Sequence, residues 1–301
     1  MSVDVEDWFQ VENLRGRIYR DSWSEFPLRV EDNTLRLLDL FAETGTRATF
    51  FCLGWIAERK PALIRRIVDA GHEVASHGYG HNLLYELSAS EVRTDIERAH
   101  RLLEDTAGRQ VIGYRAPSFS ITPEALEVLR DVGYAYDSSV FPVGGHDRYA
   151  SFDLERHAHG DRHGQAERPR GPGEGGSGVA DERPGVAALV KLRQGLWEFP
   201  ITTWTAFGTR LPWGGGGYFR LLPPALFRYG FERAMAQNGG AMFYLHPWEV
   251  DPGQPRVFGL KRSYAFRHYV NLGRTLGRLR ALCRSVPFTS AERVLNAAPH
   301  G

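Results

Sequence analysis

The sequence is poor in cysteine and carries little net charge. Its 301 residues include only two cysteines, Cys52 and Cys283, which lie far apart in the chain. Two cysteines cannot build a disulfide framework or a cysteine zinc cluster. The 37 Lys and Arg residues against 36 Asp and Glu residues leave a formal net charge of +1. A charge this small creates no overall field that attracts nucleic acid or anionic lipid, so we expect neither as a partner.

Long hydrophobic runs are also missing. The longest ones, at residues 48–55 and 241–245, are far shorter than the roughly 20 residues of a membrane-spanning helix. We therefore expect no transmembrane segment. The first residues contain no basic stretch and no long apolar segment of the kind found in secretory signals, which makes the cytoplasm the expected compartment. Hydrophobic residues still make up 42% of the chain, which is enough for the core of a globular protein.

Helical and extended patterns alternate in the first half of the sequence. The helical patterns each end at a glycine, a common helix stop, and they cover residues 32–43, 56–70, 88–107 and 122–132. The extended patterns between them cover residues 47–53, 72–76, 110–114 and 134–137. This order predicts an α/β fold with parallel strands, either a barrel or a doubly wound sheet. In both, functional groups lie beyond the carboxyl ends of the strands.

The second half begins with a segment that breaks this pattern. Residues 156–185 are rich in glycine and arginine and have almost no large apolar side chains, so we predict a disordered surface insertion there. The pattern then resumes with strands at 196–201 and 241–246, a helix at 223–237 and a closing helix at 262–283.

Two polar clusters follow predicted strands and together suggest a metal site. His77 and His81, four residues apart, come after one strand, and Asp4, Glu6 and Asp7 gather at the end of an opening strand at residues 2–5. Gathered carboxylates repel one another, and a cation relieves that repulsion. Two imidazoles and one carboxylate, with a position left for water, make up a catalytic zinc site.

The choice of carboxylate stays open between Glu6 and Asp7. Side chains alternate along a strand, which puts Asp4 and Glu6 on the same side. A turn directly after the strand would favour Asp7 instead, and this alternative is slightly preferred.

Three further polar residues come directly after predicted strands. Arg115 precedes a proline that stiffens the chain, and its guanidinium can pair with a carboxylate. Asp137 ends another strand, and His246 follows the apolar run Ala-Met-Phe-Tyr-Leu. Each has a plain explanation in a loop ion pair or a helix cap. Five strand ends in chain order, each with a polar group suited to hydrolysis, favour a common active site.

This ordered set resembles the polysaccharide deacetylase superfamily, the NodB homology domain of carbohydrate esterase family 4. The resemblance runs over about residues 2–247, from the acidic motif through Ser-His-Gly-Tyr-Gly-His and Arg-Ala-Pro to Leu-His. The opening Val-Asp-Val-Glu-Asp-Trp-Phe-Gln-Val and the later Phe-Tyr-Leu-His-Pro-Trp-Glu-Val-Asp-Pro are similar to a branch associated with exosortase-linked exopolysaccharide gene clusters, which has a C-terminal extension.

The resemblance implies a fold and a domain arrangement. The fold is a distorted (β/α) barrel with fewer than eight complete units, over residues 1–250 and interrupted by the insertion at about 156–185. Residues 251–301 would be a helical extension packed on the barrel. The chain begins almost on the first strand, where relatives usually have several more residues, so a truncated start is expected and weakens the expectation of a cytoplasmic protein.

The resemblance also implies an activity and roles for individual residues. The activity is metal-dependent removal of N-acetyl groups from the amino sugars of a polysaccharide or its lipid-linked precursor, with Zn²⁺ as the expected ion and an N-acetylated glycan as the partner. The implied roles are metal ligands for His77 and His81 with Glu6 or Asp7, general base for Asp4, orientation of that base for Arg115, general acid for His246, and partner of the acid for Asp137.

Four residues near these motifs are expected to contact the sugar, namely Trp8, Tyr79, Pro117 and Trp248. Two other functions stay open. One is hydrolysis of cyclic amides or imides on the same fold, and the other is a non-catalytic carbohydrate-binding module. Zinc content and acetate release from chitooligosaccharides separate the first alternative from a deacetylase. A measurable hydrolysis rate distinguishes a deacetylase from the binding module.

Overall fold

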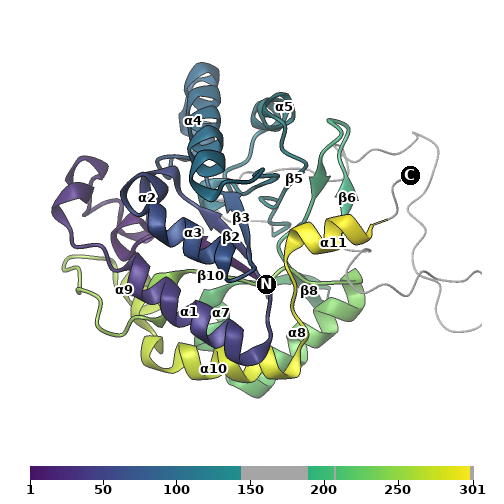
Figure 1. Cartoon of the computed structure of the whole chain (residues 1–301). Helices are drawn as coiled ribbons and strands as arrows, with labels where there is room; N and C mark the ends of the chain where they lie inside the picture. Colours follow the sequence, from purple (N-terminus) through teal and green to yellow (C-terminus); the bar gives the residue numbers. More distant parts are fainter. Residues whose placement is uncertain (144–188, 207, 299–301) are drawn as a thin grey trace, which may run out of the picture.

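The chain folds around one large sheet (Figure 1). The structure, a computed structural model, describes residues 1–143, 189–206 and 208–298. Among these residues the sheet has eight strands in the order β10-β1-β2-β3-β4-β5-β7-β6. Their bounds are β1 Ser2–Val5, β2 Thr49–Cys52, β3 Glu73–Ser76, β4 Gly113–Tyr114, β5 Tyr136–Asp137, β6 Val190–Lys191, β7 Trp197–Glu198 and β10 Tyr244–Leu245. Neighbours run parallel except β6 and β7. The sheet is an open, curled α/β barrel, as the resemblance to the polysaccharide deacetylase superfamily implied.

Helices pack around the sheet and connect its strands (Figure 1). Their bounds are α1 Val30–Thr44, α2 Gly54–Arg59, α3 Pro61–Asp69, α4 Ala89–Ala107, α5 Pro123–Val132, α7 Gly216–Leu221, α8 Pro224–Asn238, α9 Arg262–Tyr269, α10 Leu272–Ser285 and α11 Ala291–Ala297. Two further strands, β8 (Thr203–Ala206) and β9 (Thr209–Pro212), pair as an antiparallel hairpin outside the main sheet. α10 packs against α1 and α7, so the end of the chain lies against its beginning.

Helix ends follow the sequence signals closely. Gly45, Gly108 and Gly133 end α1, α4 and α5 with φ angles of 66°, 65° and 106°, a left-handed conformation that glycine adopts without a steric penalty. Ser88 opens α4 with a capping box to Glu91, as predicted. These local signals set where the crossover helices begin and end.

Two predicted helices are each divided in two. The pattern at 56–70 becomes α2 and α3 because Pro61 has no backbone N–H and disfavours the helical conformation of Lys60, whose φ is −132°. The pattern at 262–283 becomes α9 and α10, separated by Val270 in extended conformation and Asn271 at φ 54°. Asparagine tolerates the left-handed region better than most residues, which allows the sharp turn there.

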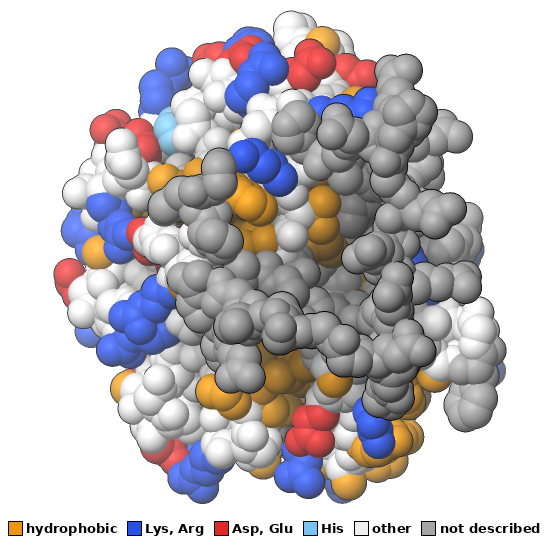
Figure 2. Space-filling model, turned by 90° about the vertical axis from the view of Figure 1, so that its right-hand side faces the viewer, with side chains coloured by type: hydrophobic (Ala, Val, Ile, Leu, Met, Phe, Trp, Pro, Cys, Tyr) orange, Lys and Arg blue, Asp and Glu red, His pale blue; other side chains and the backbone are white. Residues whose placement is uncertain are grey.

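The core lies on both faces of the central strands. Every residue of β1, β2 and β3 is buried, which is typical of parallel strands whose two faces are both covered. No helix in the described part of the chain is long and apolar enough to cross a membrane. The insertion predicted at about 156–185 lies outside the described residues. Figure 2 shows basic and acidic side chains interspersed on one face of the molecule, with hydrophobic side chains visible in several separate places.

A buried carboxyl group holds the C-terminal helix against the sheet. Glu73, at the start of β3, accepts hydrogen bonds from the Thr49 hydroxyl (2.5 Å), the Tyr136 hydroxyl (2.6 Å) and the backbone N–H of Glu292 in α11 (2.9 Å). Burial raises the pKa of Glu73 to about 7, although these hydrogen bonds favour the ionised form. The anchor of α11 therefore includes a group that titrates near neutral pH.

We expect the unfolding free energy of the wild type to fall, relative to Glu73→Gln, as pH rises from 4.5 to about 7. In this window the folded carboxyl stays protonated while the unfolded one ionises, so the folded state binds more protons and loses stability as pH rises. The difference between the pKa of Glu73 in the folded and unfolded states corresponds to on the order of 3 kcal/mol of unfolding free energy. Urea unfolding across this pH range measures it. Glu292→Gln removes a partly exposed carboxylate that contributes to the raised pKa of Glu73, and it should keep most of the pH dependence because burial is the largest cause. Parallel stability curves for wild type and Glu73→Gln would contradict the expectation.

Candidate active site

Asp4, in β1, and Arg115, directly after β4, form a buried ion pair. Arg115 Nη1 lies 2.6 Å from Asp4 Oδ1, and the arginine has no exposed surface. The other guanidinium hydrogen bonds go to the Ser2 hydroxyl (2.9 Å), the Ser138 carbonyl (2.9 Å) and the Ser138 hydroxyl (2.8 Å). Burying a guanidinium is costly unless its donors are satisfied, and here each of its three nitrogens donates at least one hydrogen bond. The arrangement fixes one oxygen of Asp4 and leaves Oδ2 on the side of His246.

Glu6, His77 and His81 form a second buried cluster beside Asp4. One potential ligand atom from each lies within 4.8 Å of the others, so the three could hold a metal ion. His81 Nε2 is 2.8 Å from Glu6 Oε2, and both side chains are buried. A buried carboxylate beside two imidazoles fits a site built for a cation. Two imidazoles and one carboxylate are also the donor set of catalytic zinc sites.

The protonation state of His77 suits a metal ligand. His77 Nδ1 donates to the Arg115 carbonyl at 2.8 Å, because a carbonyl oxygen can only accept. Its Nε2 therefore keeps a free lone pair, as is usual for metal-binding histidines held by a carbonyl. Burial lowers the pKa of His77 to about 4, so the ring is neutral at physiological pH.

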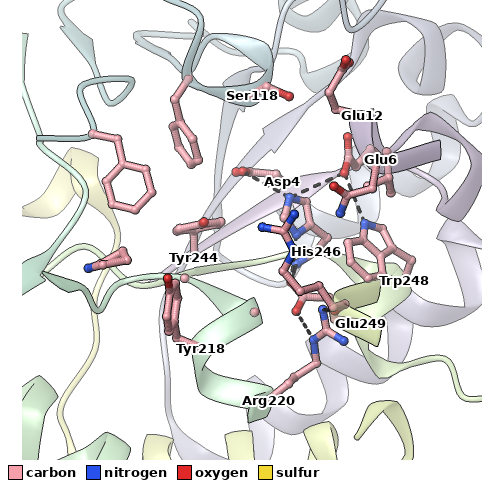
Figure 3. A pocket seen from close by; sticks show the side chains of 18 of the residues that line it. Asp4, Glu6, Glu12, Ser118, Tyr218, Arg220, Tyr244, His246, Trp248 and Glu249 are labelled. Atoms are coloured by element: carbon pink, nitrogen blue, oxygen red, sulfur yellow. Dashed lines mark hydrogen bonds and ion pairs between the residues drawn. The ribbon is translucent and has the colours of Figure 1, made fainter. Parts of the chain in front are cut away.

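Glu6 stays ionised in spite of its burial. Burial alone would raise its pKa, but the neighbouring His81 and His246 lower it to about 2. Its second oxygen accepts a hydrogen bond from Trp248 Nε1 at 3.2 Å, which holds the carboxylate in place (Figure 3). The cluster therefore presents one negative charge and one neutral imidazole toward the same point.

The structure corrects the preference for Asp7 as the metal carboxylate. Asp7 Oδ1 accepts from the backbone N–H of Trp8 (2.8 Å), and Oδ2 accepts from those of Arg29 (2.7 Å) and Val30 (2.9 Å). Asp7 therefore caps the short 3₁₀ helix η1 (Trp8–Gln10) and the start of α1. Its oxygens are occupied by donors that helix ends leave unsatisfied. Glu6 takes the place beside the histidines.

His246, directly after β10, faces both clusters. Its Nε2 lies 3.5 Å from Glu6 Oε1 and 3.8 Å from Asp4 Oδ2, and its Nδ1 lies 2.8 Å from Glu249 Oε1 (Figure 3). Burial would lower its pKa, but the carboxylates of Glu6, Glu249 and Asp4 outweigh burial and raise it to about 9. In this environment His246 is protonated at neutral pH.

The structure also corrects the predicted partner of His246. Asp137, expected in that role, accepts instead from the Ser139 hydroxyl at 2.6 Å, and burial raises its pKa beside the neighbouring Glu198 of β7. Glu249 is the partner, and sequence reasoning missed it. The spacing His-Pro-Trp-Glu carried a signal, because a glutamate three residues after a histidine can return to it across one helical turn.

These groups line one cleft of about 270 Å³ at the carboxyl ends of the strands. Asp4, Glu6, His77, His81 and His246 come to it from β1, β3 and β10 or the residues that follow them. Its other walls carry aromatic and apolar side chains, among them Phe119, Phe141, Leu221, Tyr218, Tyr244, Trp248 and Phe266. The cleft therefore combines proton-transfer groups and a candidate cation site with rings that could contact a flat, partly apolar ligand.

Of the four residues expected to contact a sugar, the structure places one in this cleft. Trp248 lines it. Trp8 is 2% exposed and packs edge-on against Phe9 and Phe26. Tyr79 donates to Glu58 and lies under the guanidinium of an α4 arginine, and Pro117 is a buried residue opening a short 3₁₀ helix. None of these three residues lines the cleft. Trp8 and Pro117 are buried in the packing of the protein, and Tyr79 is held by Glu58 and the arginine.

Two family models match the chain. The polysaccharide deacetylase family model matches residues 21–136, and the model of a domain of unknown function, DUF3473, matches residues 173–296. The first match contains His77, His81 and Arg115. The second contains His246 and its partner Glu249, so the two matches each supply part of the cleft.

Curated relatives match over about a third of the chain. The peptidoglycan deacetylase of Helicobacter pylori is 34% identical over 105 residues, which cover 35% of this chain and 36% of that protein. The chitooligosaccharide deacetylase of Sinorhizobium fredii is 33% identical over 103 residues, which cover 34% of this chain and 48% of that protein. The matched segment thus spans between about a third and half the length of these relatives.

One solved structure resembles nearly the whole chain. It is the crystal structure of a candidate polysaccharide deacetylase from Mycobacterium smegmatis, with a TM-score of 0.53 and 18% sequence identity. The superposition covers 99% of this chain and 88% of that one. At this identity the likeness concerns the fold, which agrees with the open, curled sheet described above.

Proposed function

Because the chain contains a polysaccharide deacetylase domain of the NodB type, we propose that it hydrolyses N-acetyl groups on the amino sugars of a polysaccharide or its lipid-linked precursor. One observation carries the proposal. Asp4, the cluster of Glu6, His77 and His81, and His246 converge on a single cleft from strands far apart in the sequence. Amide hydrolysis needs a base, an acid and a site that stabilises negative charge, and the cleft offers a candidate for each.

Glu6, His77 and His81 would hold a divalent ion, which we propose to be Zn²⁺. The burial of the Glu6 carboxylate beside two imidazoles and the free lone pair of His77 support this assignment. When bound, such an ion supplies Lewis-acid chemistry, lowering the pKa of a water ligand and polarising the acetyl carbonyl.

The protein side chains would supply the proton transfers. Asp4 would act as the general base, and Arg115 orients it through the 2.6 Å contact. His246, protonated at neutral pH, would donate a proton from Nε2 to the departing amine. The products would be acetate and a free amino sugar.

The biological setting belongs to the same proposal. We propose a role in exopolysaccharide biosynthesis, supported by the resemblance of the His-Pro-Trp-Glu-Val-Asp-Pro segment to the exosortase-linked branch. We also propose that residues 1–250 form the catalytic barrel and that residues 251–301 extend it. The packing of α10 on α1 and α7 supports this division.

Acetate release by the purified, zinc-loaded protein tests the function. We expect N-acetylated chitooligosaccharides to yield acetate and free amines, detected by NMR and by mass, and a metal analysis to find about one zinc per chain. Zinc-loaded protein that opens cyclic imides and releases no acetate would replace the deacetylase with the other hydrolase. Sugar binding without any hydrolysis would indicate a binding module.

Asp95, in α4, holds the loop of residues 78–82, which carries His81. Its carboxylate accepts from the backbone N–H of Tyr79 (2.7 Å) and Gly80 (3.3 Å) and from Asn82 Nδ2 (3.0 Å). It thereby holds the loop that places His81 at a positive φ of 52°. We expect Asp95→Ala to weaken zinc affinity by about 10–100-fold, as changes around metal ligands do. Isothermal titration of apoprotein measures this, with Asp131→Ala, an exposed carboxylate paired with Arg93 and Arg130, as the control. Unchanged affinity would rule out the role of Asp95.

A further inference from the structure

His246 is held by a carboxylate that the polysaccharide deacetylase family match does not include. Glu249 Oε1 accepts from both the backbone N–H of His246 (3.0 Å) and its Nδ1 (2.8 Å). A carboxylate that is ionised can only accept, so Nδ1 carries the hydrogen and Nε2 is the nitrogen that faces the cleft. The ring plane is fixed as well, since His246 stacks on Trp248 with centroids 5.2 Å apart and planes inclined by 23°.

Arg220, in α7, holds the other oxygen of Glu249. Its Nε donates to Glu249 Oε2 at 2.6 Å, and the two side chains are 2% and 1% exposed. The pairing is seen in Figure 3 on the side of Glu249 away from His246. A carboxylate buried this deeply is costly unless a charged partner compensates it, and Arg220 provides that charge.

Arg220 is itself fixed by the carboxyl end of α9. Its Nη1 donates to the carbonyls of His268 (2.8 Å) and Val270 (3.0 Å), and its Nη2 donates to that of Arg267 (2.9 Å). These carbonyls lack helical partners at the end of the helix and favour a cation. The guanidinium therefore connects α7 and α9 to the carboxylate of Glu249.

The sequence of α7 makes room for this contact. A Cβ added to Gly216, one helical turn before Arg220, would collide with the Glu249 carboxylate. Gly216 and Arg220 lie four residues apart and so share a helix face. One face of α7 thus provides both the space for Glu249 and the charge that fixes it.

We propose that Arg220 and Glu249 are positioning residues that aim Nε2 of His246 at the leaving group. This inference rests on the proposed deacetylase function and extends it to α7 and α9, which lie in the segment matched by the domain of unknown function. When the carbon–nitrogen bond of the acetamide breaks, the departing nitrogen takes a proton from Nε2. A ring free to rotate about its axis would present Nε2 there only part of the time.

Two substrates separate positioning of the acid from general damage to the site. An N-acetylated chitooligosaccharide has an amine leaving group that needs a proton, whereas 4-nitrophenyl acetate releases a stable phenolate that does not. We expect Glu249→Gln and Arg220→Met to lower kcat for the sugar by on the order of 100-fold with KM little changed. Their rates with the aryl ester should stay within about threefold, since a general acid contributes little there.

The control removes a similar ion pair that does not touch His246. Arg29 Nε lies 2.5 Å from Asp251 Oδ2, two residues after Glu249. We expect Arg29→Met to leave the ratio of sugar to ester hydrolysis unchanged. An equal loss on both substrates in Glu249→Gln and Arg220→Met would overturn the positioning role.

Imidazole NMR tests the same arrangement without relying on turnover. In ¹⁵N-labelled wild type we expect hydrogen-bonded Nδ1–H signals from His77 and His246. The His246 signal is the one that disappears in His246→Asn, and it should shift or broaden in Glu249→Gln. Glu249→Gln keeps the shape of the side chain, so it remains informative if Arg220→Met does not fold. Wild type that releases no acetate would defeat the proposed function, and a wild-type His246 without the Nδ1–H signal would defeat the positioning role.

Discussion

Asp4→Asn is expected to lower kcat/KM for acetate release by about 100-fold to 10,000-fold, the range that a general base contributes. Asparagine has nearly the same shape but cannot accept a proton. Asp4 Oδ1 is held by Arg115, while Oδ2 faces His246 across 3.8 Å, so one oxygen is available in the cleft. Zinc affinity should change little, because Asp4 lies outside the cluster of Glu6, His77 and His81.

A neighbouring aspartate provides the matched control. Asp7→Asn removes a carboxylate that is buried to the same degree but accepts only from backbone N–H groups. We expect it to cost about 1–2 kcal/mol of stability, as for a lost helix cap, and to leave the rate per folded molecule unchanged. Circular dichroism establishes the folded fraction, and acetate release gives the rate.

The comparison of the two variants decides which acid acts on the substrate. Equal activity in Asp4→Asn and wild type would remove Asp4 from the mechanism. A large loss in Asp7→Asn at full folding would show that Asp7, contrary to its contacts, takes part. The result does not depend on the identity of the natural glycan.

Much of the site could be predicted because it follows strand ends. In a parallel sheet the carboxyl ends of strands meet at one edge. Asp4, His77, Arg115 and His246 all lie at or directly after the carboxyl ends of predicted strands, which was enough to expect that they converge. Strand alternation also placed Glu6 on the side of Asp4. The preference for Asp7 was wrong because it depended on where the chain turns after β1, and that turn is set by the capping of η1 and α1 rather than by the strand.

The partners of these residues could not be predicted in the same way. Arg220 and Glu249 are 29 residues apart, and their contact depends on the placement of α7, which has no strand-end signal of its own. Asp137 lies beside Glu198 of β7 because β5 pairs with β7. That pairing joins strands separated by about 60 residues, and local sequence patterns carry little information on such distant contacts.

Replacing His77 or His81 with glutamine is expected to weaken zinc binding by at least about 100-fold, because losing a ligand costs more than losing a group that orients one. The site would then keep the Glu6 carboxylate and only one imidazole, which are too few donors to hold the ion tightly. At a zinc concentration of 100 times its Kd the wild type should gain about 2.7 kcal/mol of stability, and the variants should gain almost none. Thermal unfolding with and without zinc measures the difference.

A buried histidine away from the cleft serves as the control. His72 directly precedes β3, at the end of the strand away from the cleft. It accepts a hydrogen bond from the Ala48 N–H at 3.2 Å. His72→Gln should lower the melting temperature of the apoprotein but keep the full stabilisation by zinc. If His77→Gln and His81→Gln both keep that stabilisation, the ion binds elsewhere, and the catalytic proposal loses its cation. If zinc stabilises none of the proteins, wild type included, the cluster is not a zinc site, and the buried contact between Glu6 and His81 has a structural role only.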